Sequence, residues 1–184
     1  AIEVVNQANQ LLAKTGVKSG YAVYYNVGNG DLLEALAANS ELHFVGLVSD
    51  KVQLETLRAR FDRNGLYGER VSLLLGEVGS LEAPSYMASL TILGEGHAPL
   101  ERDTLESLFT SVRPYGGIIL PLGESDNGAL TALLAAAQLP GLTLHDSDGQ
   151  IMLAREGALP GAGTWTHQYG NIANTTKSDD SIVK

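Results

Sequence analysis

Apolar residues along the first 155 positions of the chain alternate between two kinds of spacing. In some segments they recur every three or four residues, the period of an amphipathic helix, and in others they form short runs typical of buried strands. The helical spacing predicts helices over 2–13, 32–37, 52–61, 100–112 and 127–138. The short runs predict strands over 21–27, 42–48, 71–75, 87–93, 118–122, 142–145 and 150–154.

Turn and cap residues separate these segments. Gly28-Asn29-Gly30 follows the first strand as a tight turn, and Ser49 or Asp50 is suited to cap the helix after the second strand. The sequence Arg113-Pro114-Tyr115-Gly116-Gly117 ends the fourth helix. Asp148-Gly149 tolerates positive φ at both positions, which predicts a tight antiparallel hairpin between the last two strands.

Alternation of strands and helices predicts one doubly wound, Rossmann-like α/β domain. Its sheet is expected to be mostly parallel with a C-terminal antiparallel hairpin, and its helices to cover both faces. The length of 184 residues suits a single core. We expect that domain over 1–156. The segment 157–184, rich in glycine, asparagine and serine, is expected to be an extended linker or tail.

Composition excludes several classes of partner. The formal net charge of −9 repels polyphosphates, so nucleic acid is not an expected partner. The chain shows no signal-peptide pattern and no run of about 18 apolar residues, which predicts a soluble chain without a membrane span and assigns no cellular compartment. It has no cysteine, and its four histidines show no paired spacing, so no metal site is expected.

A ligand site is expected where the first strand ends. In doubly wound sheets, small molecules bind at the carboxyl ends of the strands where strand order reverses. Gly28 and Gly30 allow a sharp turn there, and glycine also lets a ligand approach the backbone closely. A structural turn without a ligand explains the same pair equally well, because Gly-x-Gly alone is a weak signal.

Three landmarks resemble class I S-adenosylmethionine-dependent methyltransferases. They are Val27-Gly28-Asn29-Gly30-Asp31, then Gly46-Leu47-Val48-Ser49-Asp50, and then 113–117 before the fifth strand. The resemblance spans roughly residues 16–155. It implies the fold expected above, with S-adenosylmethionine as a small-molecule ligand whose methionine part lies over the first turn, whose ribose meets an acid after the second strand, and whose adenine meets a polar residue after the third.

The resemblance assigns candidate cofactor-binding residues and also shows departures from the family pattern. Gly28 and Gly30 match the first two turn glycines with Asn29 between them, and Leu32 stands where a third glycine is common. Asn26 replaces a frequent acid. At the ribose position the chain has Val48, and the polar Ser49 and Asp50 follow. Asp50 either reaches the ligand or caps the helix, and the cap is favoured. Glu77 matches the adenine-side position, with a solvated loop acid as the alternative. The implied cofactor site is partly degenerate.

Residues that act on a methyl acceptor are expected after the fourth strand, in the segment 94–99. Glu95 and His97 are the candidate catalytic residues there because either side chain can accept a proton from an acceptor. A glycine-rich surface loop without catalytic function is the favoured alternative. The sequence does not indicate which acceptor is methylated.

The tail shows a second resemblance. Trp165-Thr166-His167-Gln168-Tyr169-Gly170-Asn171 is similar to the lead-in of the pyrroloquinoline-quinone-like β-propeller of large bacterial proteins, some of which carry a methyltransferase-like domain before it. This resemblance implies that the chain is one module covalently linked to a propeller. The alternative is a tail whose tryptophan packs locally.

Two other functions compete with a methyltransferase. A catalytically inactive scaffold or interaction module of the same fold, within a propeller-containing protein, is favoured by Val48 and Leu32. A nicotinamide-dependent oxidoreductase is the weaker alternative, because the third glycine of Gly-x-Gly-x-x-Gly is replaced by Leu33.

Overall fold

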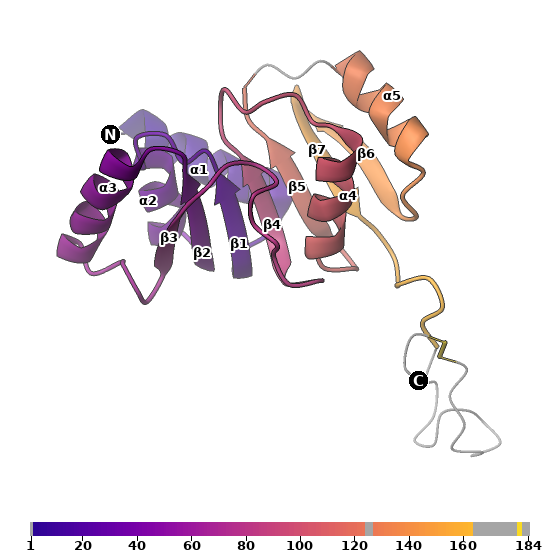
Figure 1. The fold of residues 1–184 in the computed structure, drawn as a ribbon, viewed down its shortest axis with the longest axis horizontal. Coiled ribbons are helices and arrows are strands. Elements are labelled where there is room, and N and C mark those ends of the chain that lie inside the picture. Colours follow the sequence, from indigo (N-terminus) through magenta and orange to yellow (C-terminus); the bar gives the residue numbers. More distant parts are fainter. Residues whose placement is uncertain (1, 124–126, 164–179, 182–184) are drawn as a thin grey trace.

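The computed structural model describes residues 2–123, 127–163 and 180–181 and contains a seven-stranded sheet with the order β3-β2-β1-β4-β5-β7-β6 (Figure 1). The helices are α1 (Ile2–Thr15), α2 (Asp31–Ala38), α3 (Lys51–Arg63), α4 (Arg102–Ser111) and α5 (Asn127–Ala137). The strands are β1 (Ser19–Tyr25), β2 (Glu41–Val48), β3 (Val71–Leu75), β4 (Ala88–Leu93), β5 (Gly117–Pro121), β6 (Leu142–Ser147) and β7 (Gln150–Arg155).

The first five strands pair in parallel, whereas β7 pairs antiparallel with both β5 and β6. The predicted fold class, a doubly wound and mostly parallel sheet with an antiparallel C-terminal hairpin, is therefore confirmed. Asp148 and Gly149 form the hairpin turn with φ of 51° and 77°. Strand order reverses between β1 and β4, so the crevice in which doubly wound folds bind ligands opens above these two strands.

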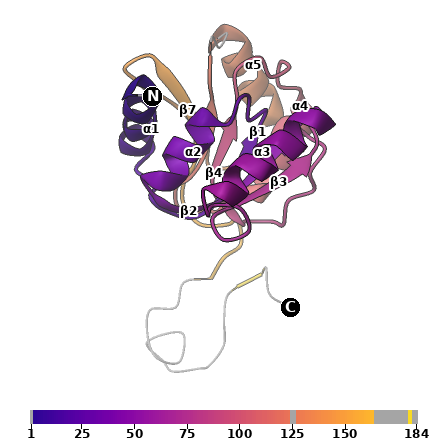
Figure 2. The ribbon, with the colours of Figure 1, turned by 90° about the vertical axis from the view of Figure 1, so that its left-hand side faces the viewer.

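Helices cover both faces of the sheet, and each face has its own core (Figure 2). On one face, α1, α2 and α3 pack apolar residues such as Leu33, Leu36 and Phe61 against β1, β2 and β3. On the other face, α4 and α5 bury Leu105 and Leu130 against the sheet. Helices on both faces explain why β4 and β5 are buried along their whole length and read as continuous apolar runs in the sequence.

The connection from β3 to β4 contains no helix, as its polar sequence predicts. It crosses the face that carries α4 and leaves the sheet partly open in front of β1 to β3 (Figure 1). Tyr21 and Leu74 on these strands are 52% and 40% exposed. The rings of Tyr21 and His43 lie against each other there, with centroids 5.7 Å apart.

Several boundaries differ from the expected ones by one or two residues, and the backbone explains two of them. The first strand ends at Tyr25 because Asn26 adopts a φ of 55°, which is incompatible with extended pairing. The fifth strand begins one residue early, since Gly117 pairs with Arg155 across the antiparallel junction. Beyond β7, residues 157–163 form no helix or strand, and the segment Trp165–Asn171 lies outside the described residues. None of the described helices is both long and apolar enough to cross a bilayer.

Candidate functional site

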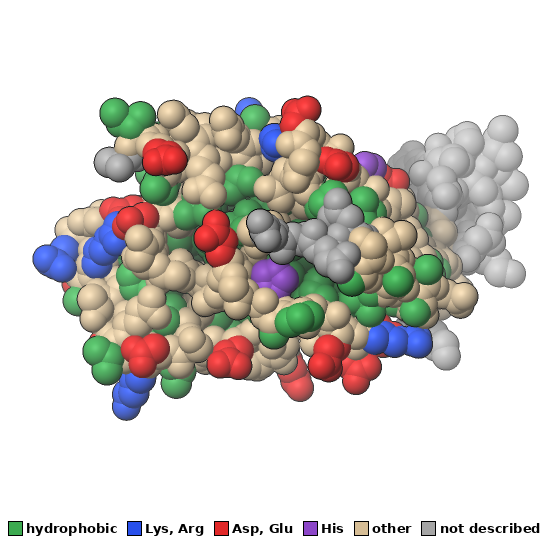
Figure 3. Space-filling model, turned by 90° about the horizontal axis from the view of Figure 1, so that it is seen from above, with side chains coloured by type: hydrophobic (Ala, Val, Ile, Leu, Met, Phe, Trp, Pro, Cys, Tyr) green, Lys and Arg blue, Asp and Glu red, His purple; other side chains and the backbone are tan. Residues whose placement is uncertain are grey.

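Three neighbouring cavities open at the carboxyl ends of the parallel strands, where the loops after β1, β3, β4 and β5 meet. Figure 3 shows this end of the molecule: recessed apolar side chains lie near its middle, beside a histidine and acidic groups, while lysines and arginines lie toward the rim. We call the three cavities the Glu77 cavity, the Tyr24 cavity and the Leu133 cavity, each after one of the residues that line it. Their volumes are about 290, 320 and 340 Å³ respectively.

The two glycines of the turn after β1 have different surroundings. Gly28 has a φ of 63°, and a Cβ built on it would meet no atom within 4 Å, so this residue faces open space in the Tyr24 cavity. Gly30 has a φ of 82°, and its Cβ would lie 2.7 Å from Leu57 Cδ2. Gly30 therefore permits α2 to pack against α3, whereas Gly28 leaves room that a bound molecule can use.

Polar side chains of α3 hold this turn in place. Gln53 Nε2 donates to the Gly28 carbonyl at 2.6 Å, and Arg60 Nη1 donates to the Asn29 carbonyl at 3.1 Å. Arg60 also forms an ion pair with Asp31, with Nη2 and Oδ1 2.7 Å apart, and the hydrogen bond to Asp31 raises the pKa of the guanidinium. Asn29 Oδ1 in turn accepts from the Asp31 amide at 3.0 Å. Hydrogen bonds and an ion pair from α3 thus hold the turn in place.

The Glu77 cavity brings together candidates from separate loops. Asn26 follows β1, Ser49 follows β2 and Glu77 follows β3, and Gly96, His97 and Ala98 close the far side. A hydrogen bond of 2.8 Å from the Glu77 amide to Ser80 Oγ shapes the loop after β3. The Glu77 side chain is exposed at the cavity wall, so its carboxylate is available to a ligand.

Neither Val48 nor Asp50 lines any of the three cavities. Val48 is 2% exposed and packs in the core. Asp50 is the N-cap of α3, and its Oδ1 accepts from the Gln53 amide at 2.7 Å, which is the capping role favoured from the sequence. The side chain that follows β2 into the Glu77 cavity is Ser49.

The Tyr24 cavity lies between the turn after β1, the loop after β4 and the first helix. Tyr24 and Glu95 line it, together with Gln7 of α1. Burial raises the pKa of Tyr24, and the nearby charge of Glu95 raises it further, so the phenol stays protonated at neutral pH. The sequence analysis did not identify Tyr24 or Gln7, because nothing in a helical or strand repeat indicates that its polar member faces a ligand.

The loop after β4 packs tightly against the end of β1. A Cβ on Gly94 would lie 2.0 Å from the Asn26 carbonyl oxygen, and the Gly94 amide donates to the Tyr25 carbonyl at 2.8 Å. Asn26 Nδ2 donates to the Glu95 carbonyl at 2.5 Å. The candidates Asn26 and Glu95, 69 positions apart in the chain, therefore meet at the centre of this edge.

Glu95 and His97 face different cavities. Glu95 lines the Tyr24 cavity, whereas His97 lies in the wall shared by the Glu77 and Leu133 cavities. His97 Nδ1 lies 2.8 Å from the Ala98 carbonyl oxygen. A carbonyl can only accept, so this contact places a proton on Nδ1 and leaves Nε2 of the neutral ring as a proton acceptor.

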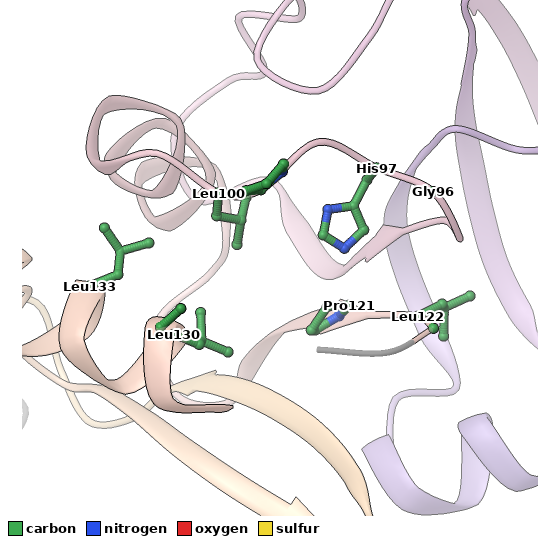
Figure 4. Close-up of a pocket in the computed structure, with 10 residues that line it drawn as sticks. Gly96, His97, Leu100, Pro121, Leu122, Leu130 and Leu133 are labelled. Atoms are coloured by element: carbon green, nitrogen blue, oxygen red, sulfur yellow. The ribbon is translucent and has the colours of Figure 1, made fainter. Parts of the chain in front are cut away.

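The Leu133 cavity is lined mostly by apolar side chains and was not expected from the sequence. It lies between the loop after β4, the end of β5 and helix α5 (Figure 4). Its wall consists of Gly96, His97, Pro99, Leu100, Pro121, Leu122, Gly123, Ala129, Leu130 and Leu133. The leucines of α5 read as ordinary core positions in the sequence, because an apolar cavity and a filled core require the same residue types. Among the described residues, no group of acidic and histidine side chains is arranged to hold a metal ion.

No protein-family description matches the sequence, and no curated protein is similar to it. Solved structures, in contrast, share the fold. A Methanococcus maripaludis protein assigned as an S-adenosylmethionine-dependent methyltransferase aligns with a TM-score of 0.69 and 13% identity, over 83% of this chain and 84% of its own.

Two further neighbours share the fold. Geranyl diphosphate methyltransferase, solved with S-adenosylmethionine, has a TM-score of 0.65 and 13% identity, over 77% of this chain and 66% of its own. The [4+2]-cyclase SpnF has a TM-score of 0.62 and 16% identity, over 77% of this chain and 58% of its own. Solved proteins that share this fold are thus named for more than one reaction. The chain described here has the fold of class I S-adenosylmethionine-dependent methyltransferases.

Proposed function

We propose that this chain binds S-adenosylmethionine at the carboxyl edge of its sheet and acts as a methyltransferase on a small molecule. One observation carries the proposal: Gly28, in a turn held by side chains of α3, presents an open backbone to a cavity at the position where strand order reverses. The methyltransferase neighbours supply the ligand class. The shape of the turn alone would also suit other small molecules.

The charge around the cavities suits this ligand. S-Adenosylmethionine carries one net positive charge, because its sulfonium and ammonium groups outnumber its carboxylate. No described lysine or arginine lines the three cavities, whereas Asp31, Glu77 and Glu95 do. A polyphosphate cofactor such as a nicotinamide dinucleotide would instead meet like charge from Glu77 and Glu95, whereas the charge of Asp31 is already paired with Arg60. The acidic lining therefore favours the sulfonium ligand.

The residues present fit the ligand in part. Ser49 and Glu77 would meet the adenosine half, with Asn26 between the two halves and Gly28 and Asn29 beneath the methionine half. The acid expected after β2 is missing, since Val48 is buried and Asp50 caps α3. Loss of one charge-assisted hydrogen bond lowers affinity by about tenfold to a hundredfold. We therefore propose that binding is weaker than in a site with a ribose-binding acid, unless Glu77 takes that role.

The missing ribose acid also favours a second candidate. In this alternative the domain is a catalytically inactive scaffold that retains the fold without the cofactor. The segment Trp165–Asn171, which resembles the lead-in of a β-propeller, fits this candidate. The resemblance implies that the chain is one module of a larger bacterial protein.

Isothermal titration with S-adenosylmethionine and S-adenosylhomocysteine separates the two candidates. We expect binding that Gly28→Leu weakens at least about tenfold. Gly65→Leu is the matched control: Gly65 has a φ of 67°, and its Cβ would also meet nothing within 4 Å, but it lies at the end of α3, outside the cavities.

Both substitutions place a side chain in a left-handed conformation and cost a similar amount of stability, about 1–2 kcal/mol. A difference in affinity therefore reports on the ligand and not on the fold. Absence of heat with both ligands at millimolar concentration would exclude the methyltransferase proposal and leave the scaffold. Equal affinities of the two variants would show that the ligand binds elsewhere.

A further inference from the structure

The Leu133 cavity offers a second site beside the proposed cofactor site. The two sites share one wall, formed by Gly96 and His97. We propose that the Leu133 cavity holds the methyl acceptor, that the acceptor is an uncharged and largely apolar small molecule with a hydroxyl group, and that His97 Nε2 takes the hydroxyl proton. The acceptor role rests on the proposed methyltransferase function; the class of ligand rests on the cavity alone.

The lining determines the class of ligand. Leucine, proline and alanine side chains supply seven of the ten lining residues, and His97 is the one ionisable side chain among the described ones. A ligand carboxylate or ammonium would lose hydration there, and the described lining residues offer no carboxylate, lysine or arginine to replace it. Apolar surface gains about 25 cal/mol per Å² on transfer into such a site. The volume of about 340 Å³ is within the range of small-molecule sites.

The orientation of His97 adds the chemistry. Its ring extends from the loop after β4 toward Pro121 at the end of β5, and both residues line the cavity (Figure 4). The Ala98 carbonyl accepts from Nδ1, so the ring is held with its basic nitrogen free. A free imidazole nitrogen in this position is suited to remove a hydroxyl proton in the transition state.

The proposed methyl transfer needs no oxidant or reductant, and His97 accepts the proton that the acceptor loses. S-Adenosylmethionine supplies an electrophilic methyl group, and its sulfur keeps the electron pair of the bond that breaks. The acceptor oxygen forms the new bond with its own lone pair, its proton passes to Nε2, and the resulting imidazolium releases that proton to solvent.

Binding of 2-naphthol and of 2-naphthoate to the intact chain, with and without saturating S-adenosylhomocysteine, tests the inference. The two probes have the same ring system, but only 2-naphthoate is charged at neutral pH. We expect 2-naphthol to bind at least about tenfold more tightly. We also expect it to shift the ¹⁵N resonance of His97 Nε2, assigned with His97→Gln, because the hydroxyl donates to this nitrogen.

Two variants of α5 locate the probe. Leu133→Trp fills the cavity and is expected to weaken 2-naphthol binding at least about tenfold without changing S-adenosylhomocysteine affinity. Ala135→Trp is the control, since Ala135 is exposed on the other side of the same helix and should leave both affinities unchanged.

The outcomes distinguish the two proposals. Binding of S-adenosylhomocysteine without binding of 2-naphthol, equal affinity for the two probes, or unchanged binding in Leu133→Trp overturns the inference and leaves the proposed function intact. An unmoved Nε2 resonance in the presence of bound probe overturns the role of His97. If 2-naphthol binds but S-adenosylhomocysteine does not, the proposed function is overturned and, with it, the acceptor role of the cavity.

Discussion

The loops that follow β1 and β4 lie side by side at one edge of the sheet but are held in different ways. The turn after β1 receives side-chain hydrogen bonds from α3, with Gln53 and Arg60 donating to its carbonyl groups. The loop after β4 is tied at its start by backbone contacts at Gly94 and by Asn26. From Gly96 to Leu100 its hydrogen bonds are local, namely those of the amide and ring of His97 with Gly94 and Ala98.

This difference suggests that the two loops have different roles in ligand binding. The turn residues Gly28 and Asn29 are held by several contacts and line the Tyr24 cavity as a fixed floor for a ligand, while Asn26 before them also lines the Glu77 cavity. The loop after β4 lines all three cavities with different residues and carries both candidate catalytic side chains, Glu95 and His97. Loops with few tertiary contacts adapt more easily to ligands. We therefore expect the first loop to determine whether the cofactor binds, and the second to determine the acceptor.

Gly94→Ala should have the largest effect on this arrangement. Its Cβ would lie 2.0 Å from the Asn26 carbonyl oxygen and 2.9 Å from that of Tyr25, and backbone atoms of adjacent strands cannot move away cheaply. We expect a loss of about 3 kcal/mol in the free energy of unfolding, measured by urea denaturation.

Gly96→Ala is the comparison within the same loop. Gly96 has a φ of 74°, but the nearest atom to its Cβ would be Asn26 Nδ2 at 3.9 Å. Only the cost of the left-handed backbone remains, about 1 kcal/mol. Equal losses in the two variants would show that the loop is not anchored at Gly94, and the contrast between the two loops would disappear.

Arg60→Met tests the anchoring of the other loop. Arg60 contacts the Asn29 carbonyl and Asp31, but its side chain is 33% exposed, so solvent screens part of the interaction. We expect a loss of about 1.5 kcal/mol, faster hydrogen exchange at residues 28–31 and a diminished dependence of stability on salt. Arg63→Met is the control, because Arg63 Nε donates only within its own helix, to the Ala59 carbonyl at 3.1 Å. Unchanged exchange at 28–31 would mean that backbone contacts alone fix the turn.

The fold could be predicted because its signals are local and repeated. Apolar spacing gives each element, and the turn residues Gly28, Gly30, Asp148 and Gly149 adopt the positive φ that glycine and aspartate favour. Candidates from three different loops, Asn26, Ser49 and Glu77, also meet in one cavity, because parallel strands end at a common edge.

The rest of the site depends on packing that one sequence does not encode locally. Leu130 and Leu133 have the same helical spacing whether they fill a core or line a cavity, and only the placement of α5 against the loop after β4 distinguishes the two. Tyr24 likewise reads as a strand residue, and its exposure to a cavity depends on α1 crossing nearby. Cavities are therefore missed where their walls come from elements far apart in the chain.

Asp50 and Glu77 provide the smallest but sharpest test, because each is an acid that follows a strand at the same edge. Asp50 accepts from the Gln53 amide at the start of α3, so Asp50→Ala should cost about 1 kcal/mol of stability, measured by urea denaturation, and leave S-adenosylhomocysteine affinity unchanged. Glu77 lines the cavity with an exposed side chain, so Glu77→Gln should leave stability unchanged and weaken that affinity about tenfold in calorimetry. If Asp50→Ala instead weakens binding, the cap must open to reach the ligand, and the floor of the site is less rigid than the contacts of α3 with the first loop imply.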